Sequence, residues 1–177
     1  MATDEFNAGP VPVRKLEPLV VIALRYLPEL PEARDALMKA LLAVGITASP
    51  EPGELLGQDP WAMWRSPSEV IVLGTHSEHT DAALAALADA KLACAVDQSD
   101  GVLALELQGP QLDDLMLRLV DSGYLPILPG TAVRVRLADI SVTLIRHMPH
   151  RIWLLAERPY AHYLIDWLNY AGAGLKP

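Results

Sequence analysis

The stretch DQSDGVLALELQGP, residues 97–110, decides the fold of this chain. Asp97, Asp100 and Gly101 are residue types that favour a turn leading into a strand. The apolar-rich run that follows predicts the strand itself. Gly109 and Pro110 then mark the start of a helix, where the missing N–H of proline costs no hydrogen bond. The stretch therefore predicts a polar turn, a short strand and a helix, in that order.

Hydrophobic periodicity predicts further strands and helices on both sides of this stretch. Strands are predicted at residues 19–26, 69–73, 102–107, 133–137, 140–144 and 151–157. Helices are predicted at residues 31–45, 79–93 and 110–121, and from residue 159 onward. Three consecutive strands near the C-terminus break a strict alternation of strand and helix, and this order is typical of an α+β fold.

The chain has 177 residues, enough for one domain with a real core or for two small halves packed together. Residues 1–18 contain three prolines and little periodicity, so we expect an extended N-terminal arm. We expect one α+β domain at residues 19–172 and a C-terminal tail at residues 173–177.

Composition narrows the class of function. The 14 basic and 22 acidic residues give a net charge of −8, which disfavours nucleic acid as a partner. The single cysteine, Cys94, fits a reducing compartment. Because neither a signal peptide nor a long apolar run is visible, we expect a soluble, cytoplasmic protein without membrane contact.

Two groups of residues are candidates for partner contacts. Trp61 and Trp64 lie in a proline-rich connection at residues 49–67, and tryptophan side chains require packing against the domain or a partner. Arg134 and Arg136 project from one face of a predicted strand. They suit either a carboxylate or acidic partner surface, or simply a solvated face.

The acidic residues of the opening stretch allow a second interpretation. Asp97 and Asp100 together suit an amine ligand or acid and base catalysis. No His, Lys or Cys is placed in the sequence to complete such chemistry, so we favour the turn. Cys94 is expected to be a buried structural thiol, because nothing near it in the sequence provides the positive surroundings of a reactive one.

The histidines form two pairs of equal spacing. His76 and His79 make one pair, and His147 and His150 make the other. Zinc requires three or four ligands at suitable spacing, and neither pair has a visible third ligand. Dinucleotide-binding, P-loop and nucleophile-elbow patterns are also absent from the sequence. We therefore predict no metal site and no catalytic residues.

Three segments, taken in order, resemble the gamma subunit of heterotetrameric sarcosine oxidase. They are residues 97–110, WRSPSEVIVL at residues 64–73, and RPYAHY at residues 158–163 followed by DWL at residues 166–168. The chain departs from the family pattern at residues 118–125, which lack the expected Cys and Asp-Leu. It also departs at Pro159, which stands where the family has a serine.

The resemblance implies a fold of two intimately packed, ferredoxin-like or βαβ-type halves, similar to the folate-binding domain of aminomethyltransferases. It implies a small subunit without catalytic activity, in a complex with a large alpha-like flavoprotein subunit and beta-like and delta-like subunits. FAD, FMN, NAD and tetrahydrofolate are then expected in those partners and not in this chain. The substrate would be sarcosine or a related N-methyl amino acid such as N-methylglutamate.

Two other hypotheses remain open at this stage. A stand-alone folate or small-carboxylate binding module would use Asp97, Asp100, Arg134 and Arg136 as its polar contacts. A metal-dependent hydrolase would use the two histidine pairs.

Overall fold

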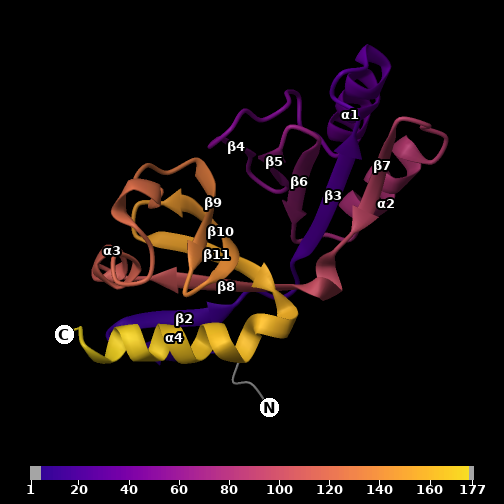
Figure 1. Cartoon of the computed structure of the whole chain (residues 1–177). Helices are drawn as coiled ribbons and strands as arrows, with labels where there is room; N and C mark the ends of the chain where they lie inside the picture. Colours follow the sequence, from indigo (N-terminus) through magenta and orange to yellow (C-terminus); the bar gives the residue numbers. More distant parts are fainter. Residues whose placement is uncertain (1–4, 176–177) are drawn as a thin grey trace. The chain divides into compact units, whose positions relative to one another are not determined.

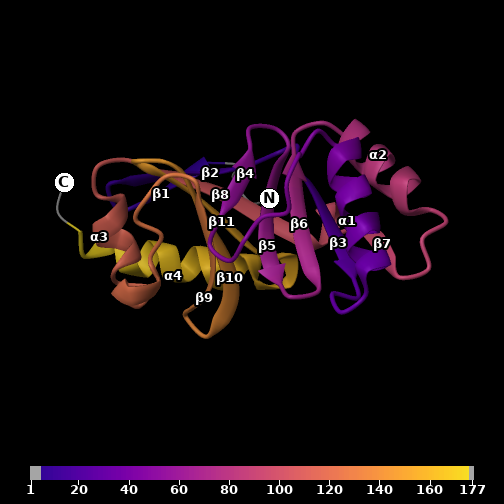
Figure 2. The same ribbon diagram turned by 90° about the horizontal axis from the view of Figure 1, so that it is seen from above.

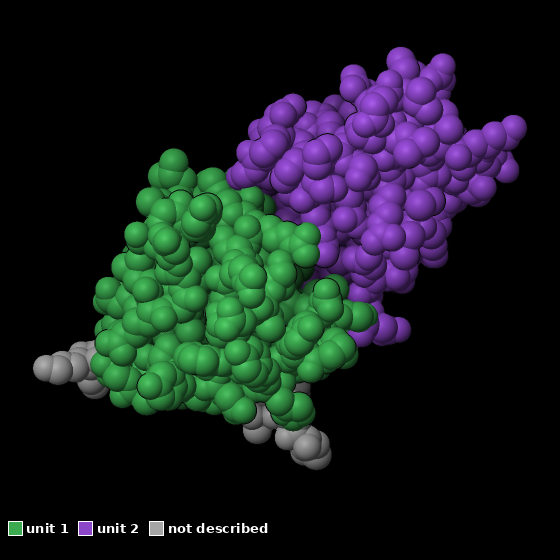
Figure 3. Space-filling view, in the orientation of Figure 1, with its two compact units in different colours: residues 1–17, 101–177 green, residues 18–100 purple. Residues whose placement is uncertain are grey.

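The computed structural model describes residues 5–175 and divides the chain into two compact units (Figure 3). Unit 1 is formed by both ends of the chain, residues 1–17 and 101–177, and unit 2 is formed by residues 18–100. The predicted domain at residues 19–172 does not coincide with this division, because residues 5–17 belong with residues 101–175 in unit 1. The boundary between the units falls inside the opening stretch, directly before Gly101.

Unit 2 is a five-stranded antiparallel sheet with two helices. It contains β3 (Val20–Tyr26), α1 (Pro31–Ala43), β4 (Leu55–Gly57), β5 (Trp61–Ser66), β6 (Glu69–Gly74), α2 (Glu78–Leu87) and β7 (Ala93–Asp97). The strand order is β4-β5-β6-β3-β7, and every pair is antiparallel. Both helices lie on one face of the sheet (Figure 2). Ile22 and Leu24 alternate along β3 toward this face, where they join the core beneath the helices.

Unit 1 is a six-stranded antiparallel sheet. It contains β1 (Glu5–Ala8), β2 (Val11–Lys15), β8 (Val102–Gln108), α3 (Leu112–Met116), β9 (Thr131–Leu137), β10 (Ile140–Met148), β11 (Arg151–Glu157) and α4 (Ala161–Ala173). The order is β1-β2-β8-β11-β10-β9. Figure 1 shows α4 running along the strands β2 and β8.

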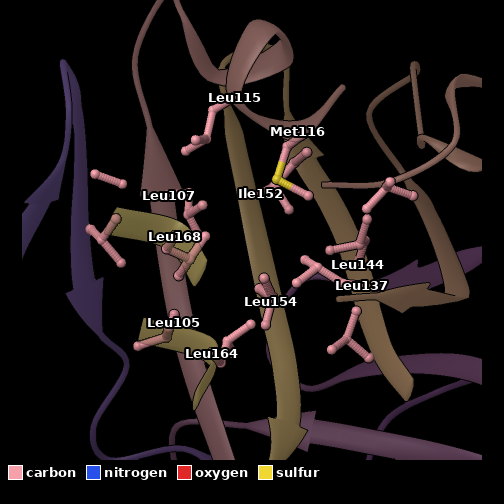
Figure 4. Close-up of a cluster of buried hydrophobic side chains, with 14 of the residues drawn as sticks. Leu105, Leu107, Leu115, Met116, Leu137, Leu144, Ile152, Leu154, Leu164 and Leu168 are labelled. Carbon is pink, nitrogen blue, oxygen red and sulfur yellow. The ribbon is translucent and has the colours of Figure 1, made fainter. Parts of the chain in front are cut away.

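The core of unit 1 lies between this sheet and its helices (Figure 4). Leu105 and Leu107 of β8 and Leu154 of β11 meet Leu164 and Leu168 of α4 there, each at most 2% exposed. Because side chains alternate along a strand, the intervening residues of β8 and β11 must point to the opposite face of the sheet.

The opening stretch folds largely as predicted. The Asp97 carboxylate accepts hydrogen bonds from the Ser99 backbone N–H at 2.9 Å and from the Ser99 hydroxyl at 2.6 Å. β8 follows, and Gly109 has a φ of +128°, a value that favours glycine. The helix is shorter than predicted: α3 begins at Leu112 and has only five residues.

Five strands escaped the sequence analysis. The predicted helix at residues 79–93 ends at Leu87, and β7 follows in the alanine-rich segment after it. Alanine has weak strand propensity, so pairing with β3 decides this strand. The connection at residues 49–67 contains β4 and β5. Trp61 and Trp64 are therefore strand residues, paired with Leu73 and Val70 of β6.

The N-terminal segment that was predicted to be an extended arm is part of the unit 1 sheet. Residues 5–15 form the hairpin β1–β2, and β2 pairs with β8. Its prolines are tolerated because Pro10 lies in the turn and Pro12 precedes Val13, the first residue of β2 that pairs with β8. Residues 1–4 of the predicted arm and 176–177 of the predicted tail lie outside the described residues, and Ala173 is the last residue of α4.

The expectation of two ferredoxin-like halves is not confirmed. Unit 2 follows the order β3–α1–β5–β6–α2–β7 with β4 added, which is a β-α-β-β-α-β arrangement. In unit 1, β9, β10 and β11 follow one another as a meander without an intervening helix.

A close approach of two glycines joins the hairpin to α4. Gly9 has a φ of +62°, and a Cβ placed there would lie 2.1 Å from the Gly172 carbonyl oxygen. A Cβ on Gly172 would lie 2.2 Å from the carbonyl carbon of Ala8. The backbones therefore touch, and neither position has room for a side chain.

We predict that Gly172→Ala lowers the free energy of unfolding by about 1–3 kcal/mol, because the new methyl group must push α4 away from the hairpin. Gly101→Ala is the matched control, since a Cβ at Gly101 meets nothing within 4 Å. Urea denaturation followed by circular dichroism measures both variants. Equal stability of the two variants would contradict the close approach.

Candidate functional site

A buried carboxylate lies at the centre of the unit 1 sheet. Glu106 is in the middle of β8, between Leu105 and Leu107, and points to the face opposite the helices. It is only 2% exposed. A charge removed from water to this extent requires partners that replace its hydration.

The strands on either side of β8 supply these partners. Arg14 and Trp153 stand directly opposite Glu106 in the registers of β2 and β11. The Arg14 Nε donates to Glu106 Oε1 at 2.7 Å. The Trp153 Nε1 donates to Glu106 Oε2 at 3.0 Å. Both carboxylate oxygens are thus bound, one by a charged donor and one by a neutral donor.

His147 completes the cluster. A register shift in β10 between Arg146 and Met148 changes the direction of the side chains there. The His147 ring stacks on Trp153 with centroids 4.2 Å apart, and its Nε2 lies 3.7 Å from Glu106 Oε2. Its Nδ1 is buried and has no hydrogen-bond partner among residues 5–175.

The ionisation of this cluster follows from its surroundings. Burial by itself raises the pKa of Glu106, but hydrogen bonds from Arg14 and Trp153 and the charge of Arg14 hold it below the ordinary value of 4.5. Burial lowers the pKa of His147 below 6.5, against the attraction of Glu106. At neutral pH the carboxylate is therefore charged and the imidazole neutral.

A cavity of about 340 Å³ opens beside Glu106. Its lining comes from β1, β2 and β8 and includes Glu5, Asn7, Arg14 and Gln108. A carboxylate with a low pKa and donors on both oxygens is a weak base, because its lone pairs are already engaged. The arrangement therefore suits the joining of three strands better than proton transfer.

A second buried charge stabilises unit 1. Arg146 of β10 is 1% exposed, and it donates hydrogen bonds to the carbonyl oxygens of Pro126 and Pro149 and to the Asp113 carboxylate. The sequence analysis missed both Glu106 and Arg146. A lone charged residue within an apolar strand was the signal available for each.

Unit 2 has its own polar cluster near the first histidine pair. The Asp59 carboxylate accepts hydrogen bonds from the Thr75 N–H at 3.0 Å and from the Thr75 hydroxyl. Burial raises the pKa of Asp59, but these bonds and the charges of His76 and His79 outweigh it and place the pKa below 3.8. His79 Nε2 lies 3.8 Å from Asp59 Oδ1. Among residues 5–175, no three His, Cys, Asp or Glu side chains are grouped to hold a metal ion.

The predicted interface residues lie in both units. Trp61 and Trp64 are half-buried on β5. Arg134 and Arg136 are exposed on β9, as the alternation predicts. The Arg134 Nε donates to the Ser141 hydroxyl at 2.8 Å, and Arg136 pairs with Asp139 at 3.3 Å.

The remaining predicted residues divide between the units. Asp97 and Asp100 belong to unit 2, whereas Arg134 and Arg136 belong to unit 1. Cys94 is exposed, so the prediction of a buried thiol is wrong. Ala93 and Ala95, on either side of it in β7, face the helices. Because side chains alternate along a strand, Cys94 points away from the helices. No helix among the described residues is long and apolar enough to cross a membrane.

The fold of this chain is similar to those of two kinds of solved structure. The chain is similar to one chain of heterotetrameric sarcosine oxidase from Corynebacterium sp. U-96, solved in complex with pyrrole 2-carboxylate. The TM-score is 0.82 at 19% identity, covering 96% of this chain and 87% of that one. It is also similar to aminomethyltransferase T of the glycine cleavage system from Bartonella henselae. That TM-score is 0.61 at 17% identity, covering 88% of this chain and 44% of that protein.

At these identities the likeness concerns the fold. The resemblance that the sequence motifs suggested is shown at this level, over nearly the whole chain. No protein-family model and no curated protein sequence matches the chain.

We predict that Glu106→Gln lowers the free energy of unfolding at neutral pH by about 1–3 kcal/mol, because it removes a charge-assisted hydrogen bond from Arg14. The folded-state pKa of Glu106 lies below 4.5. The contribution of its charge to the free energy of unfolding is therefore present above pH 4.5 and is lost as the pH falls through the folded-state pKa. Urea denaturation from neutral pH down to pH values below this pKa should therefore show the free energies of unfolding of the variant and the wild type converging in acid. Glu157→Gln, at an exposed position, is the control, and a gap that is constant with pH would contradict the assignment.

Proposed function

We propose that this chain is a small, gamma-like subunit of a flavin-dependent, heteromeric oxidoreductase that demethylates sarcosine or a related N-methyl amino acid, and that it contributes no catalytic residue. One observation carries the proposal. The fold likeness spans 96% of this chain and 87% of a chain from a heterotetrameric sarcosine oxidase. The likeness therefore covers most of both chains and not a short shared fragment.

The second likeness supports the same assignment. This chain spans less than half of the aminomethyltransferase, 44% of its length. It therefore corresponds to part of that fold, which is what an accessory subunit related to a folate enzyme would retain.

The engagement of the buried charges supports a structural role. The Glu106 carboxylate is bound by Arg14 and Trp153, and Arg146 is bound by two carbonyl groups and Asp113. A catalytic group must be able to exchange its partner for substrate. These groups instead join neighbouring strands and loops.

The chemistry would then take place in partner subunits. A flavin bound by a partner subunit would supply the oxidation of the N-methylamine, and the released one-carbon unit would pass to tetrahydrofolate or leave as formaldehyde. FAD, FMN, NAD and tetrahydrofolate belong to a large alpha-like flavoprotein subunit and to beta-like and delta-like subunits in this proposal. The assembly is cytoplasmic.

A stand-alone folate or small-carboxylate binding module is the second candidate. The cavity beside Arg14 favours it, because the outer N–H groups of that half-exposed guanidinium could bind a carboxylate. Isothermal titration of the isolated chain with tetrahydrofolate separates the candidates. Saturable heat that Arg14→Ala removes, while circular dichroism shows that the variant remains folded, would support the module.

We predict that the tagged chain, co-expressed with the genes adjacent to its own, co-purifies with a flavoprotein at fixed stoichiometry. Light scattering after size exclusion and the flavin absorbance of the same peak measure this outcome. If the flavoprotein is soluble and elutes without the chain, the proposal is wrong.

We also predict that Arg134 and Arg136 contact the partner. Charge reversal of both to Glu should weaken the complex about tenfold or more, because opposed charges at an interface become like charges. Lys39→Glu, on the exposed side of α1, is the control. Biosensor binding of the purified large subunit gives the affinities, and equal values for the two variants would exclude the two arginines from the interface.

A further inference from the structure

The last helix has two different apolar stripes. Leu164, Leu168 and Ala171 face the core of unit 1 and are nearly or fully buried. A second stripe contains Tyr163 and Trp167, four residues apart, and continues to Tyr170 three residues later. Residues spaced in this way share one helix face, and this face is exposed.

The exposed stripe forms a groove. Tyr163, Asp166, Trp167 and Tyr170 line about 420 Å³ of open volume, and we call this set the aromatic groove. Its three rings are 41%, 38% and 76% exposed in chain order. Trp167 stands edge-to-face with both tyrosines, with centroids 6.3 Å from Tyr163 and 5.6 Å from Tyr170.

One end of the groove is held in place by unit 1. The Tyr163 hydroxyl donates to the carbonyl oxygen of Ala138 at 2.7 Å, in the turn between β9 and β10. Ala138 and Asp139 both have positive φ there, which defines the turn. The Tyr163 ring is thus held in place before any partner binds, which lowers the cost of ordering this side chain on association.

An exposed carboxylate lies at the edge of this largely apolar groove. Asp166 is solvent-accessible, and within residues 5–175 it makes neither a hydrogen bond nor an ion pair. It lies one turn from both tyrosines on the same helix face. A carboxylate beside aromatic rings favours a cationic ligand, because the ring faces and the carboxylate both attract positive charge.

We propose that the aromatic groove binds an arginine side chain of a partner polypeptide. A guanidinium can lie flat on the indole of Trp167 while it pairs with the Asp166 carboxylate, and it is less strongly hydrated than an ammonium. The net charge of −8 favours approach of a basic partner surface. Tryptophan, tyrosine and arginine are enriched among the residues that contribute most of the binding energy of protein interfaces.

This inference deepens the proposed function and rests on it in one respect, that the partner is a subunit of the complex. It names a contact surface on α4 in addition to Arg134 and Arg136 on β9. Binding of arginine itself can be measured on this chain alone, without any partner.

The first experiment uses N-acetyl-arginine N′-methylamide as the probe and its citrulline counterpart as the neutral control. The readout is the indole N–H signal of Trp167 in ¹⁵N–¹H spectra, assigned with Trp167→Phe. We expect saturable shifts with the arginine compound in the millimolar range, at least about tenfold weaker binding for Asp166→Asn, and no change for Glu157→Gln. Equal binding of both compounds, or no shift at tens of millimolar, overturns the inference.

The second experiment uses the co-expressed complex. Asp166→Lys should abolish co-purification with the flavoprotein, whereas Glu157→Lys, with the same change of charge outside the groove, should retain it. Circular dichroism of both variants establishes that they fold. If the wild type assembles and Asp166→Lys assembles equally well, this inference fails while the proposed function stands.

The remaining outcomes are also decisive. If the wild type never assembles, the proposed function fails. The arginine titration then determines independently whether the aromatic groove binds arginine. If sedimentation shows that the isolated chain is a dimer that Trp167→Lys converts to a monomer, a second copy occupies the groove and the inference is wrong.

Discussion

The cost of burying the Glu106 charge is the constraint on which unit 1 depends. A carboxylate at 2% exposure is tolerable only with donors on its oxygens, and these come from strands on both sides of β8. Arg14 and Trp153 reach it only in the observed registers of β2 and β11. A slip of one residue would turn either donor to the opposite face. The carboxylate thereby fixes three strands relative to one another, which apolar contacts alone specify less strictly.

The same pair of residues also connects the two segments of the chain that form unit 1. Arg14 and Glu106 are 92 positions apart in the sequence, and all of unit 2 lies between them. The hydrogen bond between them and the contact of Gly9 with Gly172 connect the N-terminal hairpin to elements formed much later in the chain. Unit 2 is continuous in sequence and needs no such closure. The two units therefore differ in whether contacts between distant chain segments are needed to complete them, although each is an antiparallel sheet covered by helices on one face.

Helix α4 illustrates how one element serves both the fold and association. Its leucine stripe completes the core of unit 1, and its aromatic stripe remains exposed. The buried charges of Glu106 and Arg146 each have partners within the unit, whereas Asp166 makes neither a hydrogen bond nor an ion pair among residues 5–175. Polar groups available to a partner thus lie on the surface, and those inside the protein stabilise it. That division is what the proposed role as a small subunit requires.

The sequence by itself determined β3, β6, β8, β9, β10 and β11, the two long helices and the class of fold, because apolar periodicity within a segment reports which side of it faces a core. It also identified the turn before β8 from Asp97 and Gly101. Only the tertiary structure decided β1, β2, β4, β5 and β7, whose segments are short or contain alanine and proline. β2 and β7 pair with the distant strands β8 and β3, and β1, β4 and β5 extend these sheets through local hairpins. The same holds for Glu106 and Arg146. A lone charge in an apolar strand is visible in the sequence, but the groups that make its burial tolerable are contributed by residues far away along the chain.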